Sequence, residues 1–117
     1  MREIIYVGGN GKNCDVPPWE VKYTGKATKQ RKVLPPEFSN ALLALVKDLQ
    51  WGGPVQKSWP HYGMIKGQKK NIDIRHCHLN KGYPTYVVAW KVVDKAKKIM
   101  EIIHVGTHEK TNYRRMG

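Results

Sequence analysis

Acidic residues are scarce in this sequence of 117 amino acids, which has 9 Asp and Glu against 21 Lys and Arg. Residues 1–57 hold 9 basic and 5 acidic groups (net +4), and residues 58–117 hold 12 basic and 4 acidic groups (net +8). Excess positive charge attracts polyanions, because binding releases the counterions condensed on phosphates. We therefore expect nucleic acid, the ribosome or an acidic protein as a partner. The alternative is a basic surface that only keeps the protein soluble.

Long apolar runs and cysteines are also lacking. No run of about 18 apolar residues occurs, so we expect no membrane span and no membrane partner. The apolar stretch in the opening "MREIIYVGGNGK" is too short for a secretory signal, which makes the cytoplasm the expected location. Cys14 and Cys77 lie far apart in the sequence. Two thiols make no disulfide framework, so we expect both to be free, with one or both buried.

The best-defined helix is predicted over residues 36–50. Pro36 suits the first helical turn, Glu37 complements the positive end of the helix dipole, and the "GGP" of residues 52–54 ends the helix. A shorter, basic helix is predicted over residues 26–33. Apolar residues spaced by three and four line one face of the long helix: Phe38, Ala41, Leu42, Leu45, Val46 and Leu49.

Strands are predicted where apolar residues alternate or cluster, at residues 19–25, 71–79, 84–94 and 99–105. The short connections between the last three favour antiparallel hairpins. We therefore predict an α+β fold. It has an antiparallel three- to four-stranded sheet, with the long amphipathic helix and a short one packed on one face.

Two histidines fall on one strand, in the segment "RHCHL". Because neighbouring residues of a strand point to opposite faces, His76 and His78 should share one face, and Arg75 and Cys77 the other. The histidines could bind zinc or line a basic groove for phosphate. No CxxC or HExxH spacing accompanies them, so we predict neither a metal nor a cofactor. The alternative is that at least one is only a hydrogen-bonded residue of the sheet.

The preceding loop, residues 55–70, combines aromatic and basic side chains. A cationic loop with aromatic groups can bind phosphate and stack nucleobases, and the candidate phosphate-binding groups are Lys66, Lys69 and Lys70. Its aromatic and imidazole groups are Trp59, His61 and Tyr62. An equally good reading is that Trp59 and Tyr62 only close the edge of the core.

The segment "HVGTHEKTNYRR" follows the last predicted strand. His104 lies within that strand and is predicted to be structural. His108 should lie just past the strand end, where an imidazole can accept or donate a proton. Tyr113 could stack a base or donate a hydrogen bond. Further cations could neutralise a pentacovalent phosphate: Lys110, Arg114 and Arg115. Basic tails with one histidine, however, usually bind RNA without cutting it.

Residues 72–113, "IDIRHCHLNKGYPTYVVAWKVVDKAKKIMEIIHVGTHEKTNY", resemble the C-terminal sheet of RelE/ParE-superfamily toxins. The likeness is strongest to the RelE-type branch of cytotoxic translational repressors of type II toxin–antitoxin systems. The long helix and the segment "GGPVQKSWPHYG" also fit that branch. The resemblance implies a RelE-like toxin domain at residues 19–117, preceded by an N-terminal extension, a strand or an arm, at residues 1–18.

The resemblance also implies a function. RelE-type toxins enter the ribosomal A site and cut mRNA without metal, by attack of the ribose 2′-hydroxyl, until an antitoxin neutralises them. It implies catalytic roles for His108, Arg75 and Tyr113, with His76 and His78 holding phosphate. In one departure, Val87 stands where several family members have Arg, so Arg75 or a lysine of residues 66–70 would have to substitute, or the nuclease is weak or inactive. The alternatives are a ParE-like topoisomerase inhibitor and a non-catalytic RNA-binding module.

Overall fold

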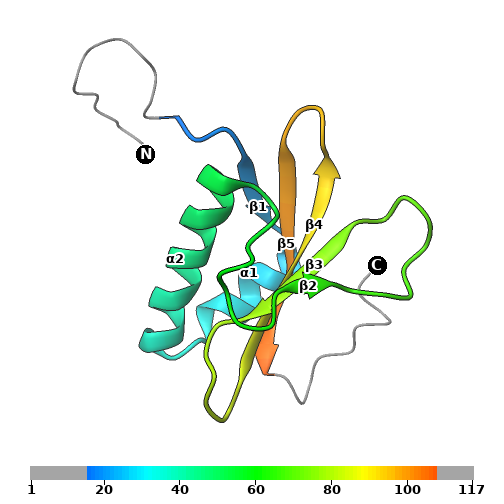
Figure 1. Cartoon of the computed structure of the whole chain (residues 1–117). Helices are drawn as coiled ribbons and strands as arrows, with labels where there is room; N and C mark the ends of the chain where they lie inside the picture. Colours follow the sequence, from blue (N-terminus) through cyan, green and yellow to red (C-terminus); the bar gives the residue numbers. More distant parts are fainter. Residues whose placement is uncertain (1–15, 108–117) are drawn as a thin grey trace.

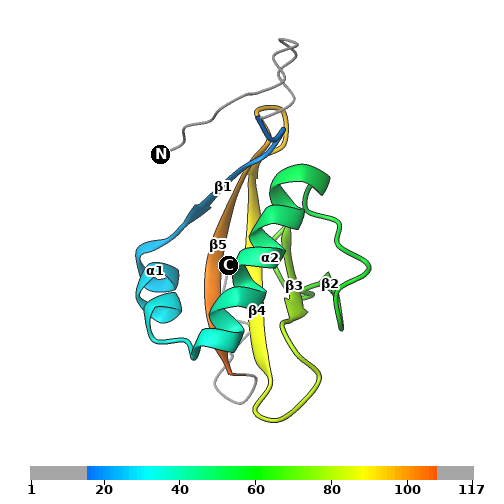
Figure 2. The ribbon, with the colours of Figure 1, turned by 90° about the vertical axis from the view of Figure 1, so that its left-hand side faces the viewer.

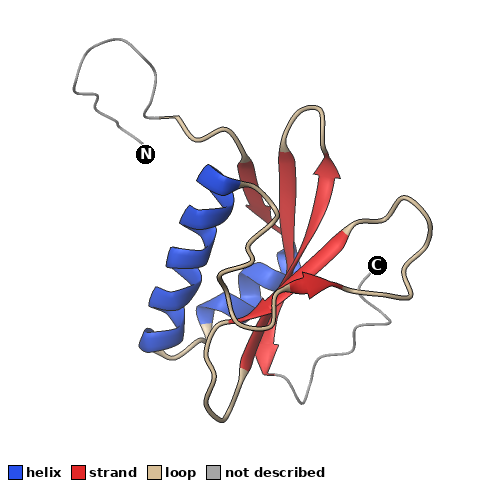
Figure 3. Ribbon diagram, viewed as in Figure 1, coloured by secondary structure: helices blue, strands red, loops and turns tan. Residues whose placement is uncertain are grey.

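The computed structural model describes residues 16–107, and these form two helices and five strands. The strands, drawn in red in Figure 3, belong to one sheet. Their spatial order is β1-β5-β4-β3-β2 (Figure 1). In chain order the elements are β1 (Glu20–Tyr23), α1 (Gly25–Lys32), α2 (Pro36–Gly52), β2 (Gly63–Met64), β3 (Ile74–His78), β4 (Tyr86–Asp94) and β5 (Ile99–Thr107). The α+β class predicted from the sequence is confirmed for this part of the chain.

The sheet is larger than predicted and is not wholly antiparallel, so those two parts of the prediction were wrong. β1 runs parallel to β5, with Glu20 opposite Ile99, whereas the other pairings are antiparallel. Alternation identifies β1 as a strand but does not reveal a partner so distant in sequence. β2 has two residues, too few to show a period of two.

The long helix α2 forms where the sequence predicted it. Pro36 lies in its first turn, and the apolar stripe turns toward the sheet, burying Leu42, Leu45 and Leu49. Gly53 follows the helix with φ 87°, a conformation that favours glycine, and donates its N–H to the Leu49 carbonyl at 2.9 Å. A Cβ at Gly53 would also lie 3.1 Å from Nε1 of Trp19. Residue 53 is thus restricted to glycine by its backbone and by its neighbour.

The short helix predicted over residues 26–33 is present as α1. The Thr24 side chain caps it by accepting a hydrogen bond from the Ala27 N–H at 3.1 Å. Ala27 is buried, while the basic residues of α1, which are Lys26, Lys29, Arg31 and Lys32, are exposed. Arg31 also lies over the Tyr23 ring, with its guanidinium carbon 4.4 Å from the ring centroid. α1 therefore presents a cationic surface and packs through one small residue.

α2 covers one face of the sheet, and α1 lies beside β1 and β5 (Figures 1 and 2). The main core lies under the helices and joins their buried residues to Val88 and Trp90 of β4 and to Met100 and Ile102 of β5. A smaller cluster of Ile65, Ile74 and Ala89 lies on the opposite face. We call that opposite face, to which His76 and His78 also point, the open face.

Two predictions that concern single features can be checked in the described residues. Cys77 is a free, fully buried thiol, and burial raises its pKa to about 12. Cys14 lies outside the described residues. Neither helix in residues 16–107 is long and apolar enough to cross a membrane.

Candidate nucleic-acid interface

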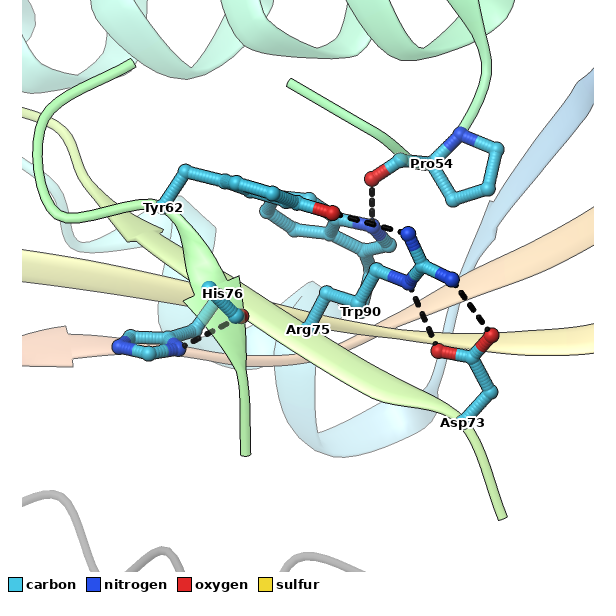
Figure 4. A network of polar contacts seen from close by, with 7 residues as sticks. Pro54, Tyr62, Asp73, Arg75, His76 and Trp90 are labelled. Atoms are coloured by element: carbon cyan, nitrogen blue, oxygen red, sulfur yellow. Dashed lines mark hydrogen bonds and ion pairs between the residues drawn. The ribbon is translucent and has the colours of Figure 1, made fainter. Parts of the chain in front are cut away.

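β3 divides its polar side chains between the two faces of the sheet, as its alternation predicted. Cys77 joins the core under α2, and Arg75 points to the same side, toward Tyr62 and Trp90 (Figure 4). His76 points to the opposite side in the same view. The structure therefore does not bring Arg75 together with the histidines in one site.

Arg75 is held in a network on the α2 side. Its Nε and Nη2 donate to the two carboxylate oxygens of Asp73 at 2.8 and 2.9 Å, and its Nη1 donates to the Tyr62 hydroxyl at 2.8 Å (Figure 4). The Arg75 side chain is 14% exposed. The hydrogen bond that Arg75 donates to Asp73 raises the pKa of Arg75 above its ordinary value. The guanidinium thus ties the loop before β2 to the start of β3.

Three imidazoles gather at the open face. The rings of His61 and His78 are stacked with centroids 4.3 Å apart, and the His76 and His78 centroids are 6.4 Å apart. Nδ1 of His76 lies 3.1 Å from the Gly63 carbonyl oxygen. A carbonyl can only accept, so Nδ1 of His76 donates, and in the neutral ring the lone pair is on Nε2. In residues 16–107 no group of three His, Cys, Asp or Glu side chains is placed to hold a metal ion.

The end of β5 lies at the same end of the sheet as His78. Cross-strand pairing places His78 opposite Val87, and Val87 opposite Gly106. Thr107, the last described residue, is paired with Tyr86. Val87 is fully buried within this row. His78 is thus the polar side chain that the pairing places next to Val87 on β3.

The fourth described histidine, His104, is in a different environment. It is 5% exposed, and its Nδ1 lies 3.5 Å from the Gln30 side-chain nitrogen. Burial, and secondarily the charge of Lys26, lowers the pKa of His104 to about 4. Gln30 also accepts a hydrogen bond from the Val105 N–H at 2.8 Å. A neutral, buried imidazole fits the structural role predicted for His104.

The predicted lysine cluster lies away from the imidazoles. Lys66, Lys69 and Lys70 are exposed on the loop between β2 and β3. That loop leads into the Asp73 end of β3, whereas His78 is at the other end of the strand. The remaining predicted site residues lie outside the described residues: His108, Lys110, Tyr113, Arg114 and Arg115.

His61 is the one member of the imidazole group that was not predicted as a site residue. The sequence placed it in a loop able to bind phosphate and stack bases, but nothing local to the sequence indicated that it would stack on His78. That contact depends on the path of the loop, in which the Pro60 carbonyl accepts from the His78 N–H at 2.8 Å. The turn residues of "PHYG", in the loop before a strand with two histidines, were the sequence feature that could have linked His61 to that strand.

Comparison of the whole structure with solved structures identifies three similar chains. The archaeal RelE–RelB complex from Pyrococcus horikoshii OT3 matches with a TM-score of 0.63 and 16% identity, covering 80% of this chain and 99% of that one. The DinJ–YafQ toxin–antitoxin complex of E. coli matches with a TM-score of 0.60 and 20% identity, covering 79% and 94%. The YoeB dimer from Staphylococcus aureus matches with a TM-score of 0.58 and 13% identity, covering 78% and 98%.

At the level of sequence, no protein-family model and no curated protein matches the chain. The structural likeness nevertheless extends over nearly the full length of each of the three solved chains. It agrees with the resemblance seen in residues 72–113. The chain therefore has the fold of the RelE-type toxins.

Proposed function

We propose that the protein is a cytoplasmic, ribosome-dependent mRNA endoribonuclease, the toxin of a toxin–antitoxin pair. The observation that carries the proposal is the group of three imidazoles on the open face, at the end of the sheet where β5 ends. Imidazole is the side chain best suited to move protons near neutral pH. The RelE-type fold and the net charge of +12 support an RNA substrate.

Cleavage by such a site needs a base, an acid and cations around phosphorus. The base removes the proton of the ribose 2′-hydroxyl, and the 2′-oxygen attacks the adjacent phosphorus. The bond from phosphorus to the 5′-oxygen breaks, and that oxygen takes a proton from the acid, leaving a 2′,3′-cyclic phosphate and a 5′-hydroxyl. We assign one of the proton-transfer roles to His108, which follows Thr107 directly in the chain.

The other assignments follow from the placement of the described residues. His76 and His78 lie on the open face and are proposed to contact the phosphate. Because Val87 offers no cation, His78 beside it is the better substitute for the family's Arg than Arg75, which is engaged on the other face. The catalytic role of Arg75 stays a prediction, as do stacking by Tyr113 and phosphate binding by Lys110, Arg114, Arg115 and the lysines of residues 66–70.

An antitoxin is the second proposed partner. Two of the three similar structures are complexes with an antitoxin protein, RelB or DinJ. A basic protein of this kind is matched by an acidic or amphipathic segment, which would neutralise the toxin by covering the open face.

Induced expression of wild type beside His108→Ala tests the proposal. The variant should lose about 10²–10⁴ in cleavage rate, because a positioned acid or base contributes that much. Growth arrest, translation and the 5′ ends of mRNA are the readouts. Lys95→Ala, an exposed change in the β4–β5 turn, is the matched control and should behave as wild type. Full arrest and full mRNA cleavage by His108→Ala would show that the role given to this imidazole is wrong.

A second candidate function is RNA binding without cleavage. Two observations favour it: Val87, which aligns by the resemblance with an Arg of several family members, is a buried apolar residue, and Asp73 already pairs with Arg75. This candidate predicts stoichiometric, salt-dependent binding to ribosomes with no new mRNA ends. The same expression experiment also checks the ParE-like alternative, which predicts persistent DNA breaks.

A further inference from the structure

The loop that precedes β2 is anchored on both sides of His61 by hydrogen bonds of neighbouring residues. Trp59 donates its indole N–H to the Asp48 carboxylate at 2.8 Å, which fixes the loop to α2. The Tyr62 hydroxyl accepts from Arg75 at 2.8 Å, which fixes it to β3. Between these two anchors, the Pro60 carbonyl accepts the His78 N–H at 2.8 Å. The residue at the tip, His61, is therefore presented by a firmly attached turn.

The backbone of His61 has an unusual conformation. Its φ is 54°, in the left-handed region that glycine adopts freely and other residues adopt at a cost. An ordinary turn could use glycine here. Such a conformation at a residue other than glycine is a starting point for a functional hypothesis, which here rests on the contacts of the ring.

One face of the His61 ring is covered by the ring of His78. The two rings stack with a centroid distance of 4.3 Å and an interplanar angle of 27°. His61 as a whole is exposed, and within residues 16–107 no second aromatic ring stacks on it. A flat, exposed aromatic surface therefore lies beside the other two imidazoles of the open face.

We propose that the outer face of His61 is a nucleobase-stacking subsite. Histidine is one of the side chains on which the bases of single-stranded RNA stack. The ring of His78 supports His61 from behind, so that a base on the outer face extends a stack already two rings deep. The neighbouring phosphate would then lie near His78 and His76. The assignment rests on the proposed RNA substrate and adds the group that positions one of its bases.

The test uses purified full-length protein and a short single-stranded RNA carrying one 2-aminopurine. All riboses are 2′-O-methylated, so that attack by a 2′-hydroxyl is impossible. At low ionic strength, wild type should quench the fluorophore, because stacking quenches its emission. His61→Trp should also quench it. His61→Gly should bind about 5- to 150-fold more weakly, the range measured when a base-stacking aromatic is removed.

Two controls separate base stacking from other effects. An oligonucleotide with an abasic site in place of the 2-aminopurine should bind wild type and His61→Gly equally, because the phosphates are unchanged. The melting temperature of His61→Gly should be no lower than that of wild type, since glycine suits φ 54°.

The subsite is overturned if His61→Gly quenches and binds as wild type does, or if wild type neither binds nor quenches. It is also overturned if His61→Gly loses affinity for both oligonucleotides alike and melts earlier, since the ring would then hold the loop. The nuclease proposal is tested separately, by the 5′ ends of mRNA after induced expression. Quenching that depends on His61 without cleavage refutes the nuclease and keeps the subsite, and cleavage without such quenching does the reverse.

Discussion

The four described histidines show how the environment decides what one residue type can do. His61, His76 and His78 lie on or above the open face, and none of the three is buried. His104 lies buried against Gln30 and Lys26, and its pKa is lowered to about 4. It is therefore neutral at physiological pH and unsuited to proton transfer there.

The buried His104 predicts a pH dependence of stability. Its pKa is about 4 in the folded protein, against 6.5 as the ordinary value. Between these values the unfolded chain binds the proton and the folded protein does not. Stability is therefore unaffected by His104 above about pH 6.5 and falls as the pH drops toward 4, by about 2 kcal/mol at pH 5.

Chemical denaturation of wild type and His104→Asn at about pH 7.5 and pH 5 measures this effect. Asn cannot titrate, so the difference between the two proteins isolates His104 from the carboxylates and the other histidines. We expect wild type to lose more stability on acidification than His104→Asn does. Equal losses would show that the folded protein binds the His104 proton as readily as the unfolded chain does.

At the residue scale, the sequence predicted the face of the sheet to which a side chain points better than it predicted the residues that the side chain contacts. Alternation correctly placed Arg75 and His76 on opposite faces of β3. It could not reveal that the Tyr62 hydroxyl would accept a hydrogen bond from Arg75, because that contact depends on the path of the loop. The stacking of His61 on His78 was beyond reach for the same reason: a single left-handed residue sets the direction of that ring.

At the scale of elements, β3 and the loop before β2 are joined through Arg75. Breaking the bidentate pair with Asp73→Asn should lower the free energy of unfolding by about 1–3 kcal/mol, because the largely buried guanidinium loses a charged acceptor. Thermal or urea unfolding measures this. Glu101→Gln, which removes the same charge from a residue with no ion pair among residues 16–107, is the control and should have a small effect.

The same variant decides between two roles for Arg75. If it is a cross-link, Asp73→Asn should reduce stability and leave the cleavage rate per folded molecule near that of wild type. A large loss of cleavage with unchanged stability would instead place Arg75 and Asp73 in the reaction.

The elements themselves were largely readable in the sequence. The stripe of α2, the basic α1 and the strands β3, β4 and β5 all follow from periodicity and turn residues. The parallel pairing of β1 with β5 was not readable, because periodicity describes each segment alone. The two-residue β2 exists only because Gly63 and Met64 lie beside β3.

At the scale of the whole molecule, exposed cations lie at both ends of the sheet, and those of α1 lie toward the end where β5 ends. α1 has four exposed cations and no acidic residue, and its Gln30 bonds to Val105 near the end of β5. Its cations are therefore closer to the proposed site than those of the β4–β5 turn, at the opposite end of β5. No carboxylate among residues 16–107 pairs with the α1 cations.

Charge reversal tests this asymmetry. Lys29→Glu with Lys32→Glu should weaken binding to ribosomes or RNA and flatten the dependence of log affinity on log salt by about 1–2, as two phosphate contacts are lost. Lys95→Glu with Lys97→Glu makes the same change of charge in the β4–β5 turn and should have the smaller effect. Equal effects of the two pairs would mean that only total charge matters.

The parallel pairing of β1 with β5 has a consequence during synthesis. β1 is the first described strand to leave the ribosome and β5 the last, so the sheet stays open until β5 has emerged from the exit tunnel. Gly106 and Thr107, which border the proposed site, belong to that same late strand. The last strand of the described part thus closes the sheet between β1 and β4 and, in the same step, brings its own end beside Tyr86 and Val87.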